Sequence, residues 1–130
     1  MEVQQELEGL GFSALVPDSA TMMKESNDFD VSHYKTWFGN ANDYRKKTAL
    51  IRAHFDKVAQ ADAILIINAE KHGKPGYIGG NVLMEMAIAF HADIPIYIYN
   101  PADPESPFTE EIIGLRSIVI DGDLTKIRPL

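Results

Sequence analysis

The chain has 130 residues, a length typical of one domain, and we expect residues 1–130 to form a single domain. It contains no cysteine, which excludes disulfide bonds, thiolate metal ligands and cysteine nucleophiles. Its formal net charge of −7 disfavours binding to nucleic acid or to anionic membrane surfaces. Because it has neither a long apolar run nor the features of a signal peptide, we expect a cytoplasmic protein.

The first 60 residues predict two helices and one strand. Residues 1–8 place apolar side chains at helical spacing and predict a short helix. The apolar run at 12–16 predicts a short strand, and the polar segment 18–44 that follows is long enough to be functional or partly helical. Residues 45–60 predict an amphipathic helix.

The remainder alternates strands with helices. The predicted elements are a strand at 63–67, a loop at 69–80, a helix at 81–91, a strand at 94–99, a helix at 106–115 and a strand at 117–120. Such alternation, with continuous apolar strands, predicts an α/β fold in which helices cover both faces of a parallel sheet. Folds of this kind open with a strand, so we expect that the first strand is missing here, or that a partner subunit supplies an edge.

Polar residues follow three of the predicted strands. In open parallel sheets, ligands bind at the carboxyl ends of the strands. Asp18 follows the first predicted strand, Asn68 the second and Asn100 the third. We therefore expect these three side chains, together with the loop at 69–80, to lie at the ligand-binding edge.

The loop at 69–80 is rich in glycine. Gly76, Gly79 and Gly80 allow a ligand to approach the backbone closely and permit positive φ angles. The helix that follows offers free N–H groups and a partial positive charge to a phosphate, a carboxylate or a ribose hydroxyl. The alternative is a plain turn with helix caps. His72, in the same loop, either contacts a phosphate or is simply solvated.

Glu85 is the only charged side chain between Val82 and Phe90. A helix that is apolar all round is buried, and a buried carboxylate is costly unless it is paired or neutralised. A carboxylate in that setting suits a nucleophile or an acid–base catalyst. The alternative is a glutamate on the one exposed stripe of the helix.

Standard catalytic motifs are absent from the chain. It has no lysine-containing phosphate loop, no dinucleotide-binding glycine motif and no serine-hydrolase elbow. Its four histidines do not show the spacing of a metal-binding helix, and we expect no metal.

Three segments together resemble the nucleoside 2-deoxyribosyltransferase superfamily. They are A-D-A-I-L-I-I-N at 61–68, the glycine loop with the helix N-V-L-M-E-M-A-I-A-F at 81–90, and I-P-I-Y-I-Y-N-P at 94–101. They look closest to the branch whose loop reads Y-I-G-G-N. The resemblance implies a flavodoxin-like (Rossmann-like) parallel sheet sandwiched by helices, and a homo-oligomer whose neighbouring subunits complete the sites. It also implies that no cofactor is needed.

The family cleaves or transfers at the N-glycosidic bond of deoxynucleosides or their 5′-monophosphates. A helix-borne glutamate attacks the anomeric carbon, and a second base or water then takes the sugar. By position in the motif this glutamate is Glu85. The turn that contacts the ligand falls on Gly79, Gly80 and Asn81, with Tyr77 just before them.

A second hypothesis keeps the same fold and site without catalysis. In both hypotheses Asn68 and Asn100 line the pocket, which in the second belongs to a nucleotide-binding or sensing module. Ala87, which stands where the family helix often carries glycine, and the missing first strand favour this alternative.

Overall fold

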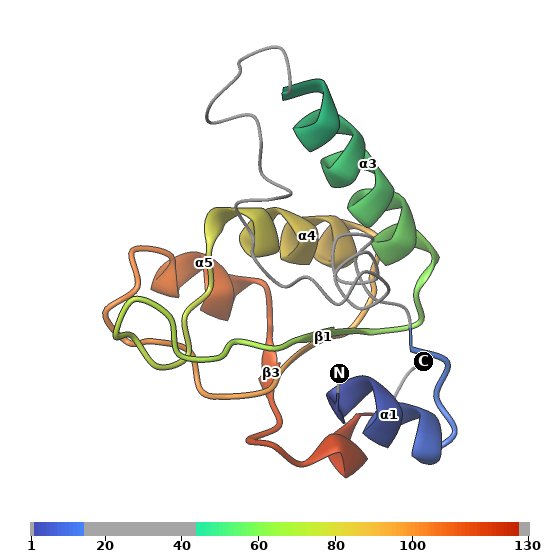
Figure 1. Cartoon of the computed structure of the whole chain (residues 1–130). Coiled ribbons are helices and arrows are strands. Elements are labelled where there is room, and N and C mark those ends of the chain that lie inside the picture. The colour runs from blue at the N-terminus through green and yellow to red at the C-terminus, as the bar shows by residue number, and fades with distance from the viewer. Residues whose placement is uncertain (1, 15–43, 128–130) are drawn as a thin grey trace. The chain divides into compact units, whose positions relative to one another are not determined.

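The computed structural model of the chain describes residues 2–14 and 44–127, and these form parts of two compact units, Met1–Lys57 and Val58–Leu130 (Figure 1). Residues 12–14, the first part of the predicted strand at 12–16, do not form a strand. The rest of that strand, the segment from 18 to 43 and the candidate Asp18 lie outside the described residues.

The first unit contains helix α1 (Glu2–Gly9) and most of helix α3 (Tyr44–Gln60). The spacing of apolar residues predicted both helices. Their predicted ranges, 1–8 and 45–60, agree with the observed ends to within one residue. The chain leaves α1 through a turn, where Gln4 Nε2 donates a hydrogen bond of 3.4 Å to the carbonyl of Ala14.

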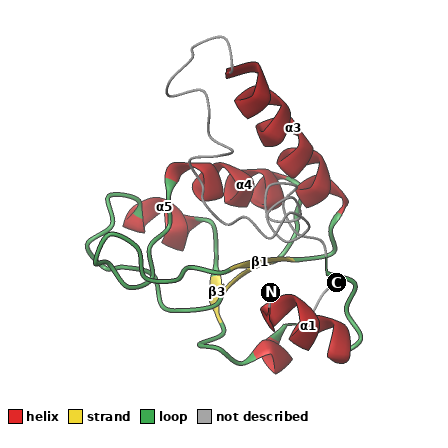
Figure 2. Cartoon of the chain, in the orientation of Figure 1, coloured by secondary structure: helices red, strands yellow, loops and turns green. Residues whose placement is uncertain are grey.

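The second unit contains a three-stranded parallel sheet, shown by strand colour in Figure 2. Its strands β1 (Ile64–Ile66), β2 (Ile96–Ile98) and β3 (Ile118–Val119) lie in that order. In the register of the sheet, Ile64 of β1 lies opposite Ile96 of β2, and Ile98 of β2 lies opposite Val119 of β3. Each strand falls within an apolar run that predicted it, and the parallel pairing confirms the predicted α/β class.

Helices connect the parallel strands, because the chain must return to the end of the sheet at which the previous strand began before the next strand can pair with it in parallel. Helix α4 (Gly80–His91) joins β1 to β2, and helix α5 (Thr109–Gly114) joins β2 to β3. A single 3₁₀ turn, η4 (Leu124–Lys126), follows the last strand. In the described ranges no helix is long and apolar enough to cross a membrane.

The core of this unit lies between α4 and the sheet. Met86 and Ala89 of α4 are fully buried, and α4 contacts both β1 and β2. All three residues of β2 are buried, whereas Ile118 and Val119 of β3 are 47% and 41% exposed. Similar apolar runs therefore reach different depths, because β2 has a strand on each side and β3 pairs with β2 alone among the described strands.

Candidate functional site

Asn68 and Asn100 stand two residues beyond β1 and β2 and bind each other. The backbone N–H of Asn100 donates to Asn68 Oδ1 at 2.8 Å, and Asn68 Nδ2 donates to the Asn100 carbonyl at 2.7 Å. Asn100 Nδ2 returns a bond of 3.1 Å to the Asn68 carbonyl. The buried side chain of Asn68 thus extends the pairing of the two strands beyond their ends. The structure brings these two predicted site residues together, and the Asn68 amide is engaged in holding the strands.

Gly76 anchors the glycine loop to the segment that follows β2. Its carbonyl accepts hydrogen bonds from the backbone N–H of Asp103 at 3.2 Å and from Asn68 Nδ2 at 3.5 Å. Its φ is +72°, and a Cβ built on it would lie only 2.0 Å from the carbonyl oxygen of Pro101. Glycine is therefore required here by the close approach of the chain's own backbone.

Gly79 and Gly80 lie at the start of helix α4, and neither uses the positive φ that glycine permits. Gly79 is the N-cap, with φ −87° and ψ 176°, and Gly80 is not among the residues with positive φ. The reason is that an N-cap residue adopts extended backbone and the next residue is already helical. Within residues 2–14 and 44–127 no side chain caps this end of the helix, and the first-turn residues Gly80 and Asn81 are exposed.

Tyr77 links the glycine loop to the start of α4. Its half-buried ring lies beside Gly79, where a built Cβ would be 3.4 Å from the ring. The ring of His72 meets it edge-on, with centroids 5.6 Å apart and an interplanar angle of 78°. The ammonium of Lys71 lies 6.0 Å from the centroid of the same ring. Tyr77 therefore joins the far end of the loop to the N-cap of α4.

Glu85 lies in the second turn of α4 and is the only acidic residue of that helix. Its side chain is half-buried, next in sequence to the fully buried Met86. The outward stripe of the helix carries Met84 and Ala87 instead, both of them exposed. Glu85 therefore lies on the flank of the helix, between the exposed stripe and the core, and its exposure is intermediate between the two alternatives that the sequence left open.

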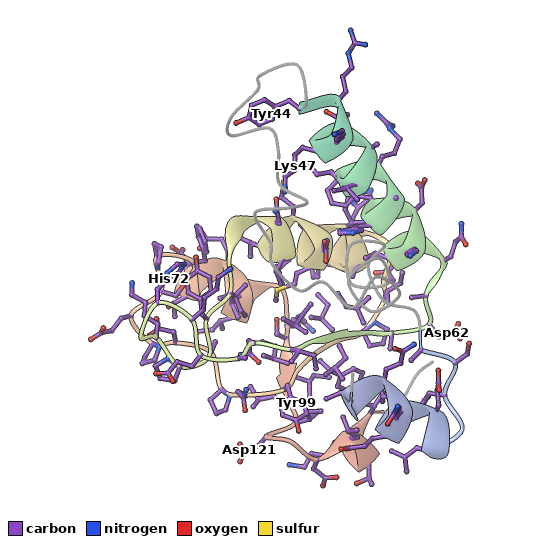
Figure 3. All side chains as sticks on the ribbon, viewed as in Figure 1. Tyr44, Lys47, Asp62, His72, Tyr99 and Asp121 are labelled. Atoms are coloured by element: carbon purple, nitrogen blue, oxygen red, sulfur yellow. The ribbon has the colours of Figure 1, made fainter. Side chains whose placement is uncertain are left out.

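These groups belong to one end of the second unit. Helix α4 begins directly after the loop that Gly76 anchors to the carboxyl ends of β1 and β2. Figure 3 shows His72 toward the end where α4 begins, whereas Asp62, which precedes β1, lies at the opposite end. The arrangement places the start of α4 and the anchored glycine loop at the carboxyl end of the sheet, with the half-buried Glu85 in the second turn of that helix.

Sequence reasoning missed Asp103. This residue is buried, its Oδ1 accepts a hydrogen bond of 2.9 Å from the backbone N–H of Glu105, and its own N–H binds Gly76. The segment Pro101–Pro104 carried the signal, because an aspartate between prolines favours a turn closed by its own carboxylate.

In the described part of the chain, no group of three or more histidine, aspartate or glutamate residues is placed to hold a metal ion. Comparisons with protein-family models, with curated proteins and with solved structures give no match for this chain.

Proposed function

We propose that this chain is a nucleoside 2-deoxyribosyltransferase-like protein of flavodoxin-like (Rossmann-like) fold. It would cleave or transfer at the N-glycosidic bond of a nucleoside, a deoxynucleoside or a 5′-monophosphate of either. The observation that carries the proposal is the placement of Glu85, half-buried on a helix that starts at the carboxyl ends of the parallel strands. The resemblance of segments 61–68 and 81–90 to that superfamily supports it.

Glu85 would act as the nucleophile. Its carboxylate attacks C1′ of the sugar, the C1′–N bond breaks, and the bonding pair leaves with the base, which takes up a proton. Water or a second base then attacks C1′ and releases the carboxylate, so the configuration at C1′ is retained. No cofactor enters this sequence of steps.

The start of α4 would hold the sugar or its phosphate. The exposed first turn, Gly80 and Asn81, has backbone N–H groups without partners inside the helix, and the helix dipole adds a partial positive charge. Exposed apolar side chains on the same helix, Met84 and Phe90, are of the kind that a subunit interface covers, in keeping with a homo-oligomer.

Base release tests the proposal. Purified protein is incubated with a panel of nucleosides, deoxynucleosides and their 5′-monophosphates, with and without an acceptor base, and the bases are resolved by chromatography. We expect Glu85→Gln to lower base release by on the order of 10³-fold, because removal of a nucleophile typically costs that much or more. The matched control is Glu111→Gln, an exposed glutamate of α5.

Two outcomes would contradict the proposal. Equal base release by the wild type and by Glu85→Gln would show that Glu85 is not the nucleophile. A folded protein that releases no base, yet is stabilised by a nucleotide, would be a binding module instead. Such stabilisation amounts to about 2.7 kcal/mol at a ligand concentration of 100 times Kd.

A further inference from the structure

The far end of the glycine loop is a tight hairpin, Lys71–Lys74, which we call the basic hairpin. The backbone N–H of Lys71 donates to the carbonyl of Lys74 at 3.1 Å, and the reverse bond measures 3.0 Å. His72 and Gly73 form the turn between them, with φ of +55° and +71°. Positive φ at both central residues is the signature of a type I′ turn, which holds the two flanking residues directly opposite each other.

That geometry places two lysines face to face. Residues opposite each other in an antiparallel pair project from the same side of the ribbon, and like charges in these positions repel. In the described part of the chain neither Lys71 nor Lys74 has a recorded ion pair, and both are exposed. The neighbouring carboxylate, Glu70, is also exposed and also has no recorded ion pair with described residues. The hairpin therefore presents two ammonium groups to solvent in a chain of net charge −7.

Tyr77 ties the basic hairpin to the proposed site. Its ring contacts His72 edge-on and lies 6.0 Å from the Lys71 ammonium. The same ring lies beside Gly79, the N-cap of α4. A group held by the hairpin would thus lie near the helix that carries Glu85.

The base of the loop fixes the position of the hairpin. Gly76, two residues after Lys74, is bound to Asp103 and Asn68 and is buried. A short anchored loop loses little conformational entropy when it binds a ligand, because most of its backbone is already ordered.

We infer that the basic hairpin binds the phosphate of the substrate, so that nucleoside 5′-monophosphates are used in preference to free nucleosides. This inference rests on the proposed function and narrows its substrate class. A phosphate monoester carries close to two negative charges near neutral pH, which the facing Lys71 and Lys74 would neutralise. The overall charge of −7 disfavours long polyanions, whereas a single phosphate requires only this local pair of cations.

The test compares 5′-monophosphates with the matching nucleosides in the wild type and in the double variant Lys71→Gln/Lys74→Gln. We expect kcat/KM for the monophosphate to fall at least about tenfold in the variant, as expected for the loss of a charge-assisted contact, while kcat/KM for the nucleoside is unchanged. The control is Arg52→Gln/Lys126→Gln, which removes two positive charges from exposed positions elsewhere. It should leave both substrates unaffected.

Calorimetric binding of the same compounds separates this inference from the proposed function. If base is released but the double variant keeps the wild-type preference between monophosphate and nucleoside, the inference is wrong and the function stands. If no base is released, yet the monophosphate binds at least about tenfold more weakly to the double variant, the inference stands and the function fails. If monophosphate and nucleoside bind equally, or neither binds, the hairpin has no phosphate to hold and the inference is overturned.

Discussion

The base and the tip of the glycine loop differ sharply, although only a few residues separate them. At the base, Gly76 is buried and bound to Asn68 and Asp103. At the tip, Lys71 and Lys74 are exposed, and among the described residues their backbones hydrogen-bond to each other. The base is a buried polar network within the fold, whereas the tip is an exposed charged turn that contacts the body of the unit through the ring of Tyr77.

This difference separates residues that hold the site together from residues free to meet a ligand. A buried polar group costs free energy unless it is hydrogen-bonded, so substitutions at the base act first on stability. Exposed charges contribute little to stability, so substitutions at the tip act first on binding.

The largest effect should come from Gly76→Ala, compared with Gly73→Ala. Both glycines have φ close to +71°, but a Cβ on Gly73 meets nothing within 4 Å, whereas one on Gly76 meets the Pro101 carbonyl at 2.0 Å. We expect Gly73→Ala to lower the free energy of unfolding by about 1 kcal/mol from backbone strain, and Gly76→Ala by about 3–4 kcal/mol from strain and overpacking together. Urea unfolding measures both, and equal losses would show that the loop base can move away from Pro101.

A smaller effect should follow from Asn68→Ala. The substitution removes the acceptor of the Asn100 N–H and the two hydrogen bonds that Asn68 Nδ2 donates to the carbonyls of Asn100 and Gly76, and we expect a loss of about 2–3 kcal/mol. Asn100→Ala removes a single side-chain bond and should cost about 1 kcal/mol. Thermal unfolding of the two variants distinguishes them. A smaller loss for Asn68→Ala than for Asn100→Ala would show that the Asn68 side chain does not hold β1 and β2 together.

The smallest effect concerns the tip. Lys74→Glu turns a facing pair of like charges into a pair of opposite charges, and we expect it to stabilise the protein by about 0.5 kcal/mol at low salt. The gain should vanish near 1 M salt, where exposed charges are screened. Lys126→Glu makes the same charge change at another exposed position and should give no gain. Destabilisation by Lys74→Glu at low salt would show that Lys71 and Lys74 do not repel each other.

Local patterns in the sequence predicted most of the described elements. Continuous apolar runs marked β1 and β2, and the 17-residue helix α3 followed from helical spacing of apolar residues. These features depend on residues close together in the chain, so one sequence suffices to find them. The same reasoning selected Glu85 and the loop before α4, and the roles of these residues stay predictions.

Long-range contacts decided the rest. The sequence predicted that Asn68 and Asn100 lie at the same ligand-binding edge, and parallel pairing of β1 with β2 does bring them together. Only the structure shows that each side chain is hydrogen-bonded to the backbone of the other residue. The sequence predicted that Gly76 lets a ligand approach the backbone closely. In the structure it is the backbone of Pro101 that lies there. Sequence alone determined most of the strands and helices in the described ranges, because that choice is largely local, although residues 12–14 do not form the strand that it predicted there. The partners of the loop depended on tertiary structure, because residues about 30 positions apart meet only once the sheet has formed.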